Sequence, residues 1–167
     1  MKSVAILMGS DSDLSTMTSC VEQLQEFGID PIVRIISAHR TPQAADDFAT
    51  SAAENGIQVI IAAAGMAAHL AGALASRTTI PIIGVPLPSG SGLGGMDALL
   101  STVQMPPGVP VATMSLGKAG AKNAAIFAVQ ILALADKALG EKLRRFKKQQ
   151  QDAVMKKDAS LQQPTSS

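Results

Sequence analysis

The sequence predicts an α/β fold, a three-layer sandwich built around a central parallel sheet. Five short runs of β-branched and other apolar residues recur along the chain, and helical stretches separate most of them. Each run is continuously apolar rather than alternating, which is typical of parallel strands buried on both faces. Alternation of strands and helices, joined by right-handed crossovers, leads to this layered arrangement.

The strand candidates set the frame of the fold and indicate where to look for chemistry. They cover residues 4–8, 32–36, 59–63, 80–85 and 109–114. A flavodoxin-like strand order is the first expectation for such a chain. In that fold ligands bind outside the carboxyl ends of the strands.

Helix signals stand between these strands. An apolar helical spacing over residues 14–24 ends at Gly28, and Thr41 with Pro42 predicts the next helix start, as cap and first helical residue. Shorter helices are expected at 65–76 and 96–104. Residues 119–139 are predicted to form one long helix that is apolar nearly all round, so we expect another subunit to cover it.

Length and composition indicate one domain. The chain has 167 residues, of which 47% are hydrophobic, enough for one sizeable core. We assign residues 1–158 to a single α/β domain with a long C-terminal helix, after which residues 141–158 are charged and glutamine-rich. Residues 159–167 are expected to be a disordered tail, because their composition cannot support a core.

Charge and cysteine content exclude several classes of protein. The formal net charge of +1 argues against a nucleic-acid binder, and the basic stretch 142–148 is expected to be a solvated helix face rather than a nucleic-acid contact. No apolar run reaches the roughly 18 residues of a membrane span. The single cysteine, Cys20, excludes an intrachain disulfide and a cysteine-based zinc cluster. We expect a soluble, cytoplasmic protein.

Polar residues follow the first strand candidate directly. Ser10 and Ser12 lie where a helix begins, and free backbone N–H groups together with the helix dipole form an anion site there. Both serines can equally be helix caps, which is the commoner role. Asp13 can complement the helix dipole or accept hydrogen bonds from ribose hydroxyls.

The segments that follow the second and third strand candidates contain the only two histidines of the chain. Ser37, His39 and Arg40 follow the second strand; a guanidinium fork matches phosphate, and a histidine moves protons near neutral pH. An exposed, solvated His-Arg pair is the more ordinary interpretation. After the third strand, Gly65 lets a flat ligand approach the backbone closely. His69 can be catalytic, orient a ligand or be structural.

Together these signals are stronger than any of them alone. A phosphate site, a ribose acceptor and a proton carrier at one sheet edge predict an enzyme acting on a small ribonucleotide. No His, Cys and carboxylate cluster has metal-ligand spacing, so we expect no metal. Nor is there a Walker A loop or a GxGxxG after the first strand, and we expect no cofactor. The residues by themselves name neither the base nor the reaction.

Four segments of the sequence indicate which family of enzymes the chain resembles. They read MGSDSD at 8–13, SAHRTP at 37–42, AAHL at 67–70 and QMPPGVPVAT at 104–113. In this order they closely resemble the class I N5-carboxyaminoimidazole ribonucleotide mutases of bacterial purine synthesis. The resemblance covers roughly residues 3–140, and SAHRTP is its most specific segment. GKAG at 117–120 also fits the family.

The resemblance implies a reaction and an assembly. The carboxylate of N5-carboxyaminoimidazole ribonucleotide moves from N5 to C4, giving 4-carboxy-5-aminoimidazole ribonucleotide in de novo purine (IMP) biosynthesis. Carbon dioxide is lost from N5 and recaptured at C4 in a closed, dry pocket. The subunit is expected to be flavodoxin-like and to form a homo-octamer with active sites between subunits. Small walls near Gly65 and a Gly-rich lid at 87–95 would provide the dry pocket.

The resemblance also implies residue roles. His39 carries the proton, His69 matches a second family histidine near the substrate, and the ribonucleotide is bound by Ser10, Asp13 and Arg40. We add three residues at the same strand ends to the substrate-binding set: Ser12, Ser37 and Gly65.

The sequence departs from the resembling family at a few positions, and two other functions are possible for it. Family members usually have glycine at Met66 and proline at Ala71, and the loop 87–95 is one residue longer here. The nearest alternative function is the class II reaction, direct carboxylation of aminoimidazole ribonucleotide with carbon dioxide. A non-catalytic nucleotide-binding or receiver-like module is a third option. A receiver would have an aspartate at the end of its third strand, where this chain has Ala64 and Gly65.

Overall fold

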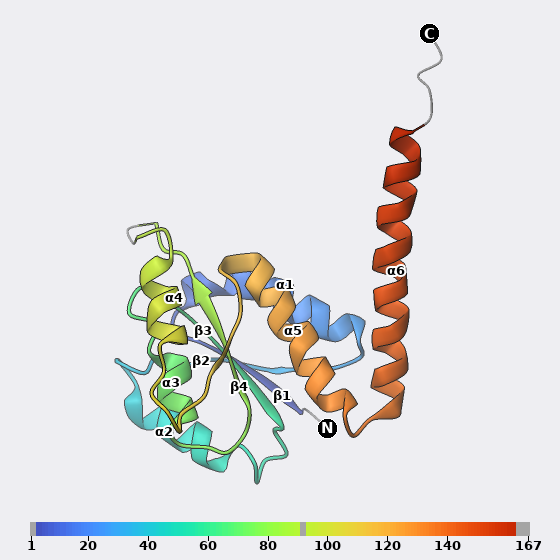
Figure 1. Ribbon diagram of the computed structural model, residues 1–167. Coiled ribbons are helices and arrows are strands. Elements are labelled where there is room, and N and C mark those ends of the chain that lie inside the picture. Colours follow the sequence, from blue (N-terminus) through green and yellow to red (C-terminus); the bar gives the residue numbers. More distant parts are fainter. Residues whose placement is uncertain (1–2, 91–92, 163–167) are drawn as a thin grey trace.

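A computed structural model describes residues 3–90 and 93–162 of the protein. Its centre is a sheet of five parallel strands in the order β2-β1-β3-β4-β5 (Figure 1), which confirms the predicted flavodoxin-like order. The strands are β1 (Val4–Met8), β2 (Ile32–Ile35), β3 (Val59–Gly65), β4 (Ile82–Leu87) and β5 (Ala112–Thr113).

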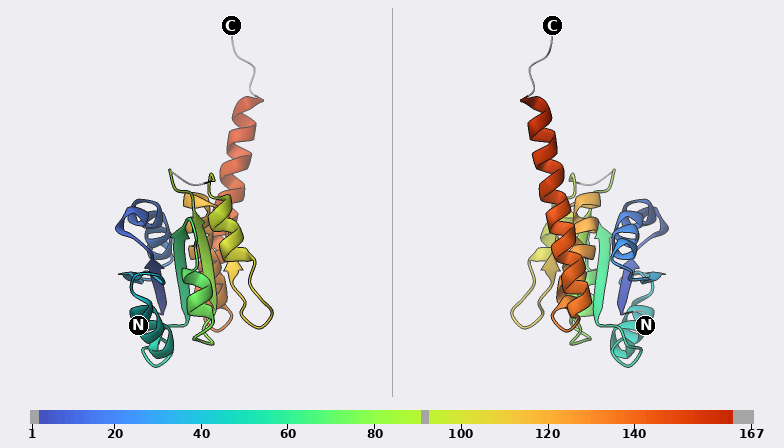
Figure 2. Two further views of the ribbon diagram at one scale, coloured as in Figure 1. Left: turned by 90° about the vertical axis from the view of Figure 1, so that its left-hand side faces the viewer. Right: turned by 90° about the vertical axis from the view of Figure 1, so that its right-hand side faces the viewer.

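Helices cover both faces of the sheet. One face carries α1 (Leu14–Glu26), which follows the short 3-10 turn η1 (Asp11–Asp13), and α5 (Gly117–Ala133). The other face carries α2 (Pro42–Ser51), α3 (Leu70–Ala75) and α4 (Met96–Val103). The last helix, α6 (Lys137–Leu161), extends away from the sandwich, as the two side views in Figure 2 show.

The central strands explain the continuously apolar runs. All of β1 is buried, and its side chains alternate between two cores: Val4, Ile6 and Met8 face α1 and α5, whereas Ala5 and Leu7 face the opposite layer. A strand covered on both faces needs apolar residues at every position.

The two edge strands depart from the prediction. In β2, Val33, Arg34 and Ile35 are exposed, so the expectation that all five strands are buried on both faces is wrong for this strand. The strand expected at 109–114 is reduced to Ala112–Thr113. Pro110 lacks an N–H, and proline is rarely found within a strand ladder.

The single helix predicted for residues 119–139 is also wrong, because the chain breaks between α5 and α6. Asp136 caps the new helix: its Oδ1 accepts hydrogen bonds from the backbone N–H of Ala138 at 2.8 Å and of Leu139 at 3.2 Å. The chain's own sheet and α1 cover the small apolar residues of α5. Most small residues of α5 are therefore buried within the subunit, whereas Ile126, Phe127 and Ile131 are only partly buried.

Helix α6 is attached to the domain only near its beginning. The ammonium group of Lys142 donates to the carbonyl of Phe27 at 2.6 Å, and the Phe27 and Phe146 rings meet edge to face at 5.3 Å between centroids. No residue of α6 is buried. The helix continues to Leu161, into the segment expected to be disordered, and residues 163–167 of that segment lie outside the described residues. Across the described ranges, no helix is long and apolar enough to cross a membrane.

Candidate active site at the carboxyl edge of the sheet

The eight residues predicted for the site line one cavity. It has a volume of about 510 Å³ and lies where β1, β2, β3 and β4 end, a size typical of small-molecule sites. The predicted residues in its wall are Ser10, Ser12, Asp13, Ser37, His39, Arg40, Gly65 and His69. Parallel strands bring these segments together because all their carboxyl ends share one edge.

The two histidines are in direct contact. His39 comes from the loop between β2 and α2, His69 immediately precedes α3, and His39 Nε2 lies 2.8 Å from His69 Nδ1. The rings are nearly perpendicular, with an interplanar angle of 77°. One of these two nitrogens must donate a proton and the other must accept it, so their tautomers are linked. The contact leaves His39 Nδ1 and His69 Nε2 to face other groups.

Arg40 reaches across the edge of the sheet. Its Nη2 donates to the carbonyl of Gly9, at the end of β1, at 2.7 Å, and its backbone N–H donates to Ser37 Oγ at 3.1 Å. The Thr41 hydroxyl binds the backbone of Ser37 on both sides, accepting from the N–H and donating to the carbonyl. Thr41 therefore shapes this loop and makes no side-chain cap on α2, contrary to the prediction that it would cap that helix.

The loop after β1 is closed by a reciprocal cap. The backbone N–H of Ser10 donates to Asp13 Oδ2 at 3.2 Å, and Ser10 Oγ accepts from the N–H of Ser12. Capping, the commoner of the two roles, is thus present, while the same side chains line the cavity. Burial raises the pKa of Asp13, although the Ser10 and Ser12 hydrogen bonds and the Arg40 charge oppose that rise.

Small residues form the wall at the end of β3. A Cβ added to Gly65 would lie 3.0 Å from the carbonyl oxygen of Leu87 on the neighbouring strand, so the close approach requires glycine. Met66 has φ of 55° and is, among the described residues, the only non-glycine in the left-handed region. That conformation favours glycine, which gives a physical reason for the glycine usual here in the resembling family.

The structure adds Ser89, which sequence reasoning missed. Ser89 lies two residues after β4 and lines the same cavity, yet its segment was interpreted only as a connector or a lid. Its hydroxyl oxygen is buried and has no hydrogen-bond partner within the described part of the chain. No sequence pattern marks it, because a serine in a Gly-rich loop is ordinary. Residues 91–92 of that loop lie outside the described residues.

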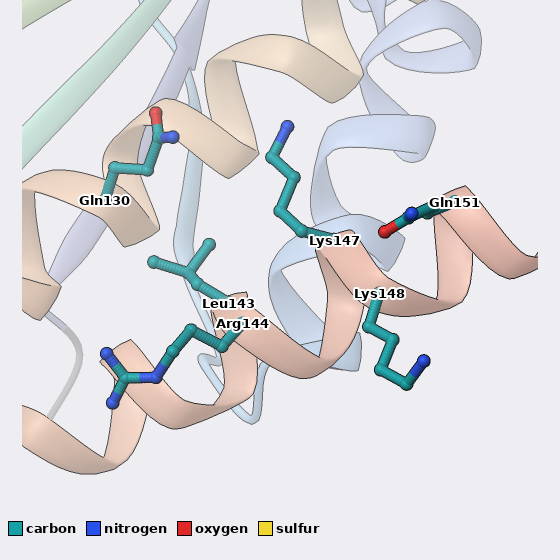
Figure 3. Close-up of a pocket in the computed structure, with 6 residues that line it drawn as sticks. All are labelled: Gln130, Leu143, Arg144, Lys147, Lys148 and Gln151. Carbon is teal, nitrogen blue, oxygen red and sulfur yellow. The ribbon is translucent and has the colours of Figure 1, made fainter.

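A second hollow lies between α5 and α6, away from the predicted site residues. The hollow has a volume of about 420 Å³. Figure 3 shows the residues that line it, which are Gln130, Leu143, Arg144, Lys147, Lys148 and Gln151. It contains neither a carboxylate nor a histidine, and none of the eight predicted site residues lines it. Within the described residues, no group of three His, Cys, Asp or Glu side chains could hold a metal ion.

Comparison with known proteins gives concordant matches. Residues 3–153 match the sequence family described as AIR carboxylase. The N5-carboxyaminoimidazole ribonucleotide mutase of Saccharolobus solfataricus is 50% identical over 155 residues, 93% of this chain and 96% of that protein. The protein of that name from Escherichia coli K12 is 51% identical over 152 residues, covering 91% and 89%. The crystal structure of Treponema denticola PurE aligns with a TM-score of 0.86 at 29% identity, covering 96% of this chain and 98% of that one.

Proposed function

The chain belongs to the AIR carboxylase family, and from this premise we propose that it is an enzyme of purine biosynthesis that isomerises N5-carboxyaminoimidazole ribonucleotide. The product is 4-carboxy-5-aminoimidazole ribonucleotide. The relatives that are half identical to it carry the name of this mutase. The observation that carries the proposal is the contact between His39 and His69 in a nucleotide-sized cavity. We place the reaction in the cytoplasm, where the buried thiol of Cys20 stays reduced.

The proposed reaction balances without an oxidant, a reductant or a co-reactant. The bond from N5 to the carboxyl carbon breaks, its electron pair stays on N5, and carbon dioxide forms. The electron-rich C4 then attacks carbon dioxide, and a new carbon–carbon bond forms. N5 gains one proton and C4 loses one, so a single group that donates and then accepts a proton completes the cycle.

His39 is the proposed proton carrier. It is next to Arg40, the proposed phosphate ligand, and its Nε2 is engaged by His69. That contact holds the ring so that Nδ1 faces the substrate, and it makes His69 the orienting residue of the pair. A positioned general acid–base group contributes about 10²–10⁴-fold to a rate.

The other predicted residues have binding roles in this proposal. Arg40 pairs with the phosphate through guanidinium N–H groups that are not engaged by Gly9. Asp13 accepts from the ribose hydroxyls. The remaining contacts to the nucleotide are assigned to Ser10, Ser12, Ser37 and Gly65. Small walls at Ala64 and Ala67 let the flat ring pack closely and leave little room for water around carbon dioxide.

We also propose a homo-oligomer, an octamer by family resemblance, with sites between subunits. Support comes from exposed apolar side chains on α4 and at Met66 rather than from α5. Met96, Leu100 and Val103 recur at helical spacing along α4 and are each roughly half exposed, and the Met66 side chain at the cavity wall is 54% exposed. An apolar stripe of this kind on a surface marks an interaction site. Light scattering of a stable monomer at micromolar concentration would contradict the assembly.

One pair of assays tests the reaction. The purified protein is incubated with N5-carboxyaminoimidazole ribonucleotide, and separately with aminoimidazole ribonucleotide and bicarbonate, while the 4-carboxy product is measured. We expect rapid conversion of the first substrate, at a rate independent of added bicarbonate. Conversion of only the second mixture would replace the proposal with the class II carboxylation. Nucleotide binding without conversion of either would identify a non-catalytic module.

A further inference from the structure

We propose that Ser89 binds the migrating carboxyl group and holds carbon dioxide between its departure from N5 and its capture at C4. This inference rests on the proposed isomerase function. Three observations carry it: the unpartnered Ser89 hydroxyl, the division of the cavity into a charged end and an apolar end, and the fixed position of the residue before Ser89.

The hydroxyl of Ser89 is the first observation. Its oxygen is buried and lacks a hydrogen-bond partner within the described residues, although Ser89 lines the cavity. Leaving a buried polar group unsatisfied costs free energy, and such groups in native proteins nearly always find a partner. A ligand that supplies an oxygen acceptor at this point satisfies the hydroxyl.

The division of the cavity indicates which part of the substrate that acceptor belongs to. Arg40, Ser10 and Asp13 line the part next to β1 and β2, where a phosphate and a ribose are recognised. Ser89 follows β4, and β3 lies between β4 and β1 in the sheet. Ser89 is therefore on the side of the cavity away from β2. The lining contributed by β3 and the loop after it is mostly apolar and consists of Ala64, Gly65, Met66, Ala67, His69 and Leu70.

The two histidines connect these parts, since His39 follows β2 and His69 follows β3. With the phosphate at the charged end, the imidazole ring of the substrate extends past His39 toward the apolar end. The group that then reaches Ser89 is the carboxyl group or the carbon dioxide formed from it. A hydroxyl can donate to either, and in a water-poor site that hydrogen bond is stronger than in water.

Ser89 is held in place by the residue before it. A Cβ added to Gly95, the residue that precedes α4, would meet Pro88 Cα at 3.2 Å, and one added to Gly117, at the start of α5, would meet Pro88 Cδ at 3.5 Å. Both glycines have positive φ, 91° and 64°. Pro88 therefore lies close to two helix starts while staying exposed, and its ring stiffens the backbone that leads into Ser89. A binding group on a fixed backbone is preorganised for its ligand.

The test is the fate of the carboxyl group in Ser89→Ala. Substrate is supplied in limiting amount, and the 4-carboxy product is measured alongside aminoimidazole ribonucleotide, which forms when carbon dioxide escapes. We expect the ratio of product to escaped nucleotide to fall roughly two- to tenfold, the range for losing one hydrogen bond to a neutral group such as carbon dioxide. The dissociation constant of aminoimidazole ribonucleotide, which has no carboxyl group, should stay within about twofold.

Controls separate the possible failures. Ser76→Ala removes an exposed hydroxyl that bonds the carbonyl of Ala73, remote from the cavity lining, and should behave as the parent does. An unchanged product ratio in Ser89→Ala would overturn the inference. The inference would also be overturned if binding of aminoimidazole ribonucleotide weakened by the same factor as turnover fell. Ser89 would then contact the nucleotide itself or stabilise the fold. A parent protein that converts no substrate would instead overturn the proposed function.

Discussion

The carboxyl edge of the sheet and the outer part of α6 are both rich in polar side chains, but they hold them differently. At the sheet edge the partners are remote in sequence: His39 contacts His69, 30 residues away, and Arg40 binds Gly9, 31 residues away. On α6 the side-chain pairs along the helix join residues three or four apart, such as Glu141 with Arg144. Lys142, near the start of the helix, donates instead to the carbonyl of Phe27, outside the helix.

This difference indicates what each region can do. Contacts between remote residues fix side chains relative to one another, and catalysis requires that preorganisation. Exposed ion pairs along one helix contribute at most a few tenths of a kcal/mol each and position nothing outside the helix. We therefore expect substitutions at the sheet edge to change chemistry and binding, and substitutions on outer α6 to change little.

The largest effect is expected for His39→Asn. Turnover of N5-carboxyaminoimidazole ribonucleotide should fall by at least ~10², because general acid–base catalysis is lost, while folding and nucleotide binding persist. His69→Asn should cost less, since only orientation of the ring is lost. Both variants are compared with the parent in the conversion assay. Near-parental turnover in the His39 variant, with collapse only in the His69 variant, would assign the proton transfer to His69.

The next effect is on binding. Arg40→Ala should raise the dissociation constant of the ribonucleotide roughly ten- to over a hundred-fold, because one charge-assisted hydrogen bond contributes about 1.5–3 kcal/mol. Arg34→Ala is the matched control: it is an exposed arginine on β2, outside the cavity lining. Calorimetry measures both constants. Equal losses in the two variants would mean that general charge, rather than the Arg40 site, attracts the nucleotide.

An effect of intermediate size on the free energy of unfolding distinguishes the start of α6, which contacts the domain, from its outer part. Phe146→Ala removes the edge-to-face contact with Phe27, which is buried, and should lower the free energy of unfolding by about 2 kcal/mol. Val154→Ala, at a side chain 67% exposed on the same helix, should change it by less than about 0.5 kcal/mol. Denaturant unfolding measures both. A large loss at Val154 would show that outer α6 is covered in the assembled protein.

The smallest effect depends on pH. Burial raises the pKa of Asp13 above its ordinary value of 3.8, so the folded chain binds this proton more tightly than the unfolded chain. The charged carboxylate therefore lowers the free energy of unfolding. This cost is absent below pH 3.8 and grows as the pH rises from 3.8 through the raised pKa.

Asp13→Asn removes that charge and keeps an oxygen acceptor for the Ser10 N–H. At pH 7 it should be more stable than the parent by about 0.5 kcal/mol or less, because solvent screens this partly exposed group, and the gain should vanish in acid. Unfolding curves across pH 3–7 measure the difference. A variant that is less stable at pH 7 would show that the hydrogen bonds of Asp13 outweigh the cost of its burial.

Much of the fold and the location of the site could be predicted from sequence. Apolar runs marked the central strands, and the rule that parallel strands share a carboxyl edge placed Ser10, His39 and His69 at one cavity wall. Prediction from local sequence pattern failed where contacts with distant parts of the chain determine burial or the end of a helix. Within the described residues β2 lies at the edge of the sheet, and the side chains from Val33 to Ile35 are left uncovered there. The break before α6 was hidden within an alanine-rich stretch, although Asp136 is an ordinary cap.

By itself, the sequence determined the features that depend on residues a few positions apart: helix periodicity, the reciprocal cap of Ser10 and Asp13, and the positions of the buried strands. The tertiary structure alone decided that His39 and His69 meet at 2.8 Å and that Pro88, close to both Gly95 and Gly117, leads into a buried hydroxyl at Ser89. The physical reason is the range of the interactions. A turn or a cap is set by bonds within one segment, whereas the meeting of two loops depends on the register and packing of every strand between them.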